Sequence, residues 1–205
     1  MEVSRIRALR GPNLWSRHTA IEAIVCCTEV ECNIDHLPGF ENRLRERFPE
    51  LAMLRPLGHE EAVSMAQALE FAALGLQAQA GCPVTFSRTA QTTEAGTYQV
   101  VVEYSEEAVG RLAFELAQSL CSAAVDDKPF ELEEALDRLR ELDEDVRLGP
   151  STGAIVYAAA ARNIPYRRLT EGSMVQFGWG SRQRRIQAAE TDRTSAVAES
   201  IAQDK

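Results

Sequence analysis

Residues 88–121, RTAQTTEAGTYQVVVEYSEEAVGRLAFELAQSLC, decide the fold. After a turn at Gly96, residues 98–104 form the densest run of β-branched and aromatic side chains in the chain. Such a run predicts a central strand that is covered on both faces. Ser105 is placed to cap a helix that follows, where apolar residues recur at helical spacing. The stretch therefore predicts a strand with a helix packed on it, and it holds no obvious chemistry.

The rest of the first 148 residues predicts further strands and helices around this centre. Strands are expected at residues 3–9, 19–30 and 83–86, and helices at residues 40–48, 60–80 and 130–145. The 83–86 strand is expected to pair with the 98–104 strand through a loop at 87–97. This order predicts an α+β fold with helices layered on a mostly antiparallel sheet.

A boundary is expected at residues 148–150, where Gly and Pro follow a charged helix. Beyond it Ser151 is expected to cap a helix that stops before Pro165. Strands are then expected at 166–169 and 173–177, a glycine-rich turn at 178–180, a strand through Ile186 and a last helix from about Thr191. This segment predicts the opening part of another domain.

Composition narrows the classes of function. The chain has 205 residues, of which 45% are hydrophobic and 26% charged, as in ordinary soluble globular proteins. The net charge of −9 argues against a dedicated nucleic-acid binder, and no apolar run approaches the length of a membrane helix. The N-terminus lacks the apolar core of a signal peptide, and the five cysteines contain no C-x-x-C pair. We therefore expect a cytoplasmic protein with reduced thiols and without nucleic-acid or membrane partners.

Two segments offer candidate binding chemistry. Residues 178–181, GWGS, can present backbone N–H groups to a phosphate, with the arginines that follow as charge partners; the alternative is a tight hairpin with arginines on its solvated face. The loop at residues 88–93 offers hydroxyls and one cation for an anionic or polar ligand, and an ordinary connecting loop would look the same. The three histidines are scattered and predict no metal site.

Three stretches together resemble cyanophycin synthetase. They are LRGPNLW at residues 9–15, R-T-x-x-T…G-x-Y-x-V-V-x-E-Y-x-E-E-x-x-G-R at residues 88–111, and the tail from Leu148. The similarity runs in order over essentially the whole chain. Residues 1–148 resemble the N-terminal domain of that family, and residues 149–205 resemble an incomplete start of its ATP-grasp module, an α/β domain.

The resemblance implies a role in making a nitrogen-storage polymer. The family joins aspartate and arginine into cyanophycin with ATP, using an ATP-grasp ligase and a Mur-ligase-like module, while its N-terminal domain holds the polymer and helps build a homotetramer. The nucleotide- and magnesium-binding core would lie beyond Lys205. We therefore expect this chain alone to be an inactive ligase without a cofactor of its own, although the full-length family uses ATP and Mg.

Many family members carry a zinc-hydrolase motif, H-x-x-E-H, on the helix expected at residues 60–80. Aligning A-G-x-P-V at residues 80–84 puts the three functional positions at Gln67, Glu70 and Phe71. Phe71 cannot bind zinc, and only the glutamate of the motif remains. We therefore expect no zinc and no hydrolysis, with Glu70 as a relic or a surface carboxylate.

The sequence thus predicts a polymer-binding or scaffolding region that is catalytically silent. The expected contacts to cyanophycin, implied by the resemblance, come from five residues: Arg88, Thr89, Arg182, Arg184 and Arg185. The expected protein partners are further copies of the chain or a full-length synthetase. Two alternatives remain open: a stand-alone interaction protein that oligomerises with a full-length synthetase, and a residual hydrolase with a rebuilt site.

Overall fold

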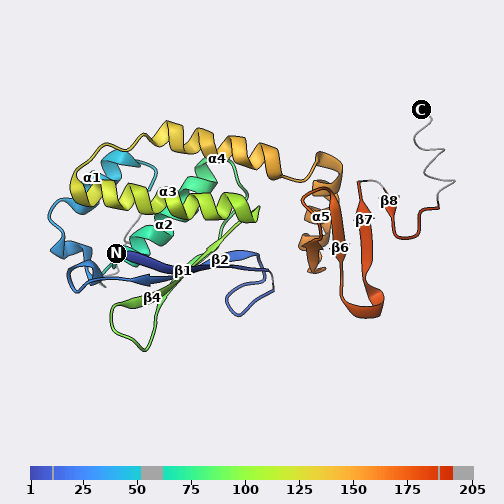
Figure 1. Ribbon diagram of the computed structural model, residues 1–205, viewed down its shortest axis with the longest axis horizontal. Helices are drawn as coiled ribbons and strands as arrows, with labels where there is room; N and C mark the ends of the chain where they lie inside the picture. Colours follow the sequence, from blue (N-terminus) through green and yellow to red (C-terminus); the bar gives the residue numbers. More distant parts are fainter. Residues whose placement is uncertain (11, 52–61, 189, 196–205) are drawn as a thin grey trace. The chain divides into compact units, whose positions relative to one another are not determined.

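The computed structural model describes residues 1–10, 12–51, 62–188 and 190–195. It divides the chain into two compact units, Met1–Asp145 and Val146–Lys205. Each unit contains one four-stranded sheet in its described part (Figure 1). No helix in the described ranges is long and apolar enough to cross a membrane.

The first unit alternates pairs of strands with pairs of helices, in the predicted order. Its elements are β1 (Glu2–Leu9), β2 (Ala20–Cys26), α1 (Phe40–Arg47), α2 (Met65–Gln79), β3 (Ser87–Gln91), β4 (Thr97–Glu103), α3 (Glu107–Asp126) and α4 (Leu132–Val146). Short 3-10 helices lie at Val30–Cys32 and Ile34–His36. The sheet has the order β1-β2-β4-β3 with antiparallel neighbours throughout, so the predicted antiparallel sheet with a central strand near 98–104 is confirmed.

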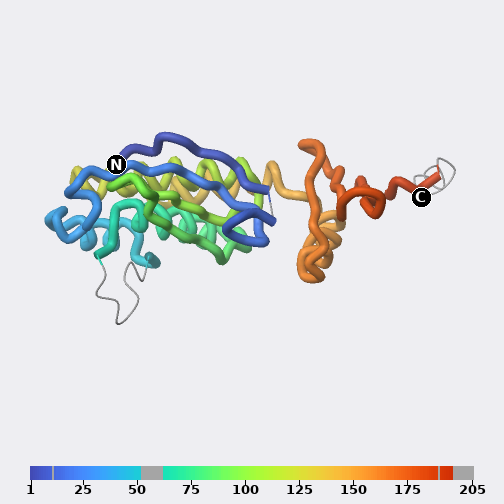
Figure 2. Tube along the Cα trace, turned by 90° about the horizontal axis from the view of Figure 1, so that it is seen from below, coloured from blue at the N-terminus to red at the C-terminus, as the bar shows by residue number. Residues whose placement is uncertain are grey.

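The two faces of this sheet have different covers. Helices α2 and α3 pack on the face that carries Val100 and Val102 (Figure 1), and from below β1, β2 and β4 run side by side (Figure 2). The other face, which we call the outer face, carries Arg5, Arg7, Glu22, Arg88, Val101 and Glu103, as the strand register shows. Val100, Val101 and Val102 are all fully buried, so β4 is covered on both sides as predicted.

The strand that precedes β4 was predicted at the wrong place. Pairing covers β3 at Ser87–Gln91, inside the expected loop, and not residues 83–86. The Glu103 carboxylate accepts the N–H groups of Thr85 and Phe86 at 2.8 and 2.9 Å, while Gln77 Nε2 donates to the Glu103 carbonyl at 3.0 Å. The Glu103 N–H also donates to the Phe86 carbonyl at 2.8 Å, and regular pairing begins one residue later, at Ser87.

Several predicted boundaries were also wrong. Residues 60 and 61 lie outside the described residues, and α2 begins at Met65, where Ser64 and Gln67 form a reciprocal capping box. The residue that caps α3 is Glu106 and not Ser105, and β2 ends at Cys26 rather than at residue 30. The predicted helices at 40–48 and 130–145 are confirmed by α1 and α4.

The second unit is small and sheet-rich. It contains α5 (Pro150–Ala161), β5 (Tyr166–Arg168), β6 (Met174–Phe177), β7 (Arg184–Gln187) and β8 (Glu190–Thr191), with an antiparallel sheet in the order β5-β6-β7-β8. Gly149, and not Ser151, caps α5, since Pro150 is its first residue. The expected last helix does not begin at Thr191, which lies in β8, and its remainder falls outside the described residues from 196 onwards. The assignment of this unit as the start of an ATP-grasp module stays a prediction.

Helix α3 approaches the sheet closely at Gly110, which yields a test of the packing. A Cβ atom there would lie 2.7 Å from Tyr104 Cβ and 3.1 Å from Ile21 Cγ1. We expect Gly110→Ala to lower the free energy of unfolding by about 1–3 kcal/mol, because the added methyl group forces α3 away from its neighbours. Urea denaturation measures this. Ser122→Ala, at an exposed position of the same helix, is the control, and equal stability of the two variants would contradict the packing.

Candidate functional site

The connection between β1 and β2 is organised by one asparagine. Asn13 Oδ1 accepts the N–H groups of Trp15 and Ser16 at 2.9 and 3.0 Å, and Asn13 Nδ2 donates to the His18 carbonyl at 2.8 Å. An asparagine side chain that bonds its own following backbone in this way fixes a tight turn without regular structure. The turn therefore fixes the backbone from which the Trp15 side chain reaches Glu22.

Glu22, in the middle of β2, is a buried carboxylate with two donors. It is 3% exposed, and it accepts hydrogen bonds from Trp15 Nε1 at 3.1 Å and from Arg7 Nε. Burial alone would raise the pKa of the Glu22 carboxyl, but the bonds from Arg7 and Trp15, with the charges of Arg7 and Arg5, outweigh it and lower the pKa below its ordinary value. Glu22 is therefore a fixed negative charge that holds Trp15 and Arg7 in place.

Arg88 meets the same cluster from the opposite edge of the sheet. In the strand register, Arg7, Glu22, Val101 and Arg88 form one row across the outer face. The guanidinium carbon of Arg88 lies over the Trp15 ring, 5.8 Å from its centroid, a cation–π distance. The side chain is exposed. A guanidinium above a ring keeps the N–H donors at its rim available to a ligand.

Glu103, the second buried carboxylate of the outer face, is also in contact with polar groups of the protein. It is 7% exposed, bonds the backbone of Thr85 and Phe86, and has His18 Nδ1 at 3.1 Å from its Oε1 atom. We call Arg7, Trp15, His18, Glu22, Arg88 and Glu103 the outer-face cluster. Its accessible polar groups are mainly guanidinium donors, because both carboxylates are buried and engaged.

Of the residues predicted to bind polymer, the structure separates Arg88 from Thr89. Consecutive residues of a strand point to opposite faces. Arg88 is therefore on the outer face, and Thr89 lies on the helix-covered face, where it interacts with Glu70. The binding of polymer by Arg88 and by Thr89 stays a prediction. Trp15, Glu22 and Arg7 were not predicted as site residues, although Trp15 ends the LRGPNLW stretch that carries the resemblance.

The three positions of the zinc-hydrolase motif have structural contacts. The Gln67 side chain accepts the Ser64 N–H at 2.8 Å as part of the capping box, and Phe71 is half-buried. Glu70 is 5% exposed, so its interpretation as a surface carboxylate is wrong. Burial raises the pKa of the Glu70 carboxyl, and the neighbouring Thr89 and Ser87 partly offset this effect. Glu70 therefore lies buried between α2 and β3.

The basic run of the second unit lies on a hairpin. Gly178 and Gly180, with φ of 70° and 59°, and a 3-10 turn at Gly180–Arg182 connect β6 to β7. Arg182, Arg184 and Arg185 are all exposed. Arg184 pairs with Phe177 and Arg185 with Gln176, so these two arginines point to opposite faces of their sheet. Their role in polymer binding stays a prediction.

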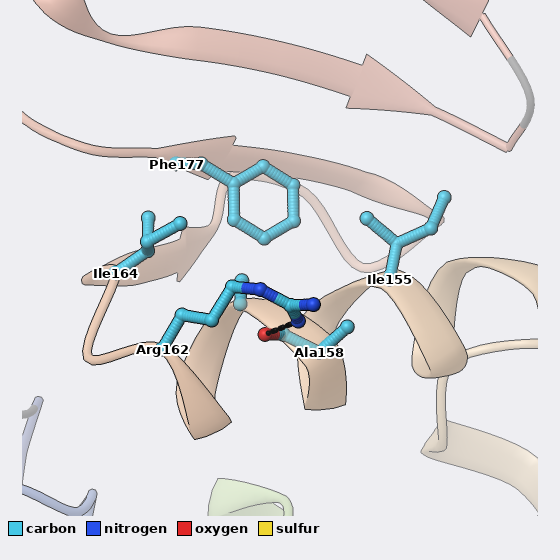
Figure 3. A pocket seen from close by; sticks show the side chains of 6 residues that line it. Ile155, Ala158, Arg162, Ile164 and Phe177 are labelled. Carbon is cyan, nitrogen blue, oxygen red and sulfur yellow. Dashed lines mark hydrogen bonds between the residues drawn. The ribbon is translucent and has the colours of Figure 1, made fainter.

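An apolar hollow lies between α5 and β6 in this unit. Its volume is about 270 Å³, and its lining residues include Ile155, Ile164 and Phe177, with Arg162 bonded to the Ala158 carbonyl at 2.8 Å (Figure 3). The lining holds no carboxylate, thiol or imidazole. Nearby Tyr157 and Trp179 are 77% and 53% exposed. The hollow therefore offers apolar contact area and no chemistry.

Comparison with known proteins identifies the family. The family described as "Cyanophycin synthase-like N-terminal domain" matches residues 24–126. The chain is 38% identical to the cyanophycin synthetase of Trichormus variabilis, 37% to that of Crocosphaera subtropica and 35% to that of Geminocystis herdmanii, in each case over its whole length. It covers 24–25% of each relative, so it spans about a quarter of their length. The chain belongs to the cyanophycin synthetase family, through its N-terminal domain.

The contacts at positions 67, 70 and 71 give a prediction about zinc. We expect the purified protein to hold no stoichiometric zinc, because Gln67 is used as a helix cap and Phe71 has no donor atom. In the described residues no group of three or more His, Cys, Asp and Glu side chains is placed to hold a metal. Metal analysis by mass spectrometry after dialysis measures this, and one zinc per chain would revive the rebuilt hydrolase.

The environment of Glu70 gives a prediction about pH. Its pKa in the folded state is raised above the ordinary value of 4.5, so its stabilising contribution is full below that value and is lost as pH rises through the raised pKa. Glu70→Gln keeps an acceptor and cannot ionise. We expect the stability of this variant relative to the wild type to increase between pH 4 and 8, by at most about 1.4 kcal/mol per pH unit.

Urea denaturation across this pH range is the measurement for Glu70. Glu115→Gln, which removes an exposed carboxylate from α3, is the control, and its difference from the wild type should change less with pH. If both variants show the same dependence on pH, Glu70 does not titrate as its burial requires.

Proposed function

We propose that the first unit holds cyanophycin, the aspartate–arginine polymer made by this family, on the outer face of its sheet without cleaving it. The observation that carries the proposal is the convergence of the stretches that resemble the family. Asn13 and Trp15 come from residues 9–15, and Arg88 and Glu103 from residues 88–111, yet Arg88 lies over Trp15 and His18 contacts Glu103.

The chemistry of the polymer suits this face. Cyanophycin carries carboxylates and guanidinium groups along its length. Guanidinium donors such as Arg88 bind carboxylates through charge-assisted hydrogen bonds, which are stronger than neutral ones. Trp15 adds a flat apolar surface beside the cation. A holding site needs exposed donors and no activated nucleophile, and this is what the outer-face cluster offers.

Absence of hydrolysis is the second part of the proposal. The motif positions on α2 hold Gln67 and Phe71 in place of histidines, and Glu70 is buried against β3. Scaffolding of a larger synthetase by the second unit, with its exposed Tyr157 and Trp179, is compatible with the same role. The relatives extend over about four times the length of this chain. Polymer synthesis is therefore proposed for the family and not for this chain alone.

A sedimentation assay with insoluble cyanophycin tests the proposal. We expect the wild-type chain to bind at low salt and to bind less at moderate salt, without release of soluble dipeptide, because screening weakens exposed ionic contacts. Arg88→Gln should bind about tenfold more weakly, the loss of one charge-assisted contact. Arg138→Gln, which removes an exposed arginine of α4, is the matched control and should bind like the wild type.

The outcomes separate the parts of the proposal. Failure of the wild type to bind at either salt concentration would exclude polymer holding. Binding that is equal in Arg88→Gln and Arg138→Gln would place the polymer elsewhere on the molecule. Release of soluble product would mean that a hydrolytic site has been rebuilt.

A further inference from the structure

The accessible charge in the middle of the outer face comes from three arginines. Arg5 and Arg88 are exposed, and the Arg7 side chain is 47% exposed although its Nε atom bonds Glu22. In the part of the chain that the structure describes, no carboxylate lies within ion-pairing distance of Arg5 or Arg88. The exposed Glu2 lies at the start of β1, before the bulge that separates Val3 from Arg5. The accessible charge of this region is therefore cationic, above the buried carboxylates of Glu22 and Glu103, on a chain whose net charge is −9.

The spacing of these arginines suits a chain and not a single small anion. Arg5 and Arg7 lie two residues apart on β1, which is about 6.8 Å along a strand. Arg7 and Arg88 share a row but are three strand spacings apart, about 14 Å. The backbone positions of the three arginines thus span more than one carboxylate covers, although the side chains of Arg7 and Arg88 both reach the Trp15–Glu22 pair. An extended polypeptide repeats its side chains on one side with the same spacing of about 6.8 Å, so successive carboxylates can contact successive arginines.

We propose that the outer face recognises carboxylate groups repeated along an extended chain, with Arg5, Arg7 and Arg88 as the contact residues. This inference rests on the proposed function and names the chemical group of the polymer that the face contacts. Arg5 has no role assigned by the sequence analysis or by the family comparison. It is in register with Ile24, whose half-buried side chain lies on the same face.

This face is not suited to bind the polymer's guanidinium groups, because the protein carboxylates on it are buried and already bonded. A guanidinium ligand needs a free carboxylate acceptor. Glu22 is bonded by Arg7 and Trp15, and Glu103 by the backbone of residues 85 and 86, with His18 Nδ1 at 3.1 Å from it. Both are under 10% exposed. A ligand that displaced these donors would leave buried polar groups without partners, which is costly.

Trp15 makes the site observable by itself. The chain has two tryptophans, and the other, Trp179, is in the second unit. In the full chain carrying Trp179→Phe, titration with a peptide of ten aspartates is expected to change the emission of Trp15 and to saturate. An aspartate dipeptide should need about a tenfold higher carboxylate concentration for the same change, because it cannot engage several arginines at once.

The variants separate this inference from the proposed function. Arg5→Gln should weaken the binding of the ten-aspartate peptide about fivefold and reduce retention on cyanophycin, whereas Arg138→Gln should change neither. Arg5 makes no ion pair in the described residues, so the variant is expected to fold, and its thermal unfolding verifies this. If cyanophycin retains the wild type while Trp15 emission does not respond and Arg5→Gln has no effect, the inference is wrong and polymer holding stands. If the wild type is not retained, the proposed function fails, whatever the peptide does.

Discussion

The end of strand β4 is the point on which the first unit depends. The Glu103 carboxylate binds the backbone that leads into β3, and His18 reaches it from the β1–β2 connection. The Glu103 carbonyl accepts from Gln77 of α2, whose Nε2 atom also bonds the Ala73 carbonyl. One residue thus joins a helix, two strands and the loop that carries Trp15. Because buried polar groups need partners, these bonds, together with the bond from the Glu103 N–H to the Phe86 carbonyl, hold the segment that leads into β3 against the end of β4.

The two faces of the sheet separate two functions that the family resemblance implies, polymer hydrolysis and polymer binding. On the helix-covered face Glu70, the position at which the family resemblance places the hydrolase glutamate, is buried against Ser87 and Thr89. On the outer face Arg88, the neighbour of Thr89, is exposed beside Trp15. A strand places consecutive residues on opposite faces, so one short segment serves the core with one side chain and solvent with the next.

The sequence predicted those elements whose signal is local. Strand β4 and helices α1 and α4 follow from runs and periods of apolar residues that need no partner to be recognised. The start of β3 could not be predicted from local signals, because it depends on pairing with β4, which lies elsewhere in the chain. The cluster of Arg7, Trp15, Glu22 and Arg88 was missed for the same reason: the register of four strands puts Arg7, Glu22 and Arg88 in one row, and Trp15 reaches them from the β1–β2 connection. The left-handed glycines of the β6–β7 hairpin, by contrast, were visible as a turn.

The chain has a net negative charge, whereas the accessible charged side chains in the middle of its outer face are arginines. Both charges affect how the proposed mixed-charge polymer would bind. At a net charge of −9 the molecule as a whole attracts guanidinium groups and repels carboxylates. At physiological salt, however, charges further apart than about 8 Å are largely screened, so a carboxylate close to the outer face interacts mainly with the groups of that face, the exposed Arg5, Arg7 and Arg88 and the buried Glu22 and Glu103. In the proposed complex the carboxylates of the polymer would contact the outer face, and its guanidinium groups would be attracted by the net negative charge of the chain. A polymer with carboxylates alone would be attracted only by the arginines of the outer face, and a polymer with guanidinium groups alone only by the net charge of the chain. A ligand that carries both kinds of charge is therefore favoured.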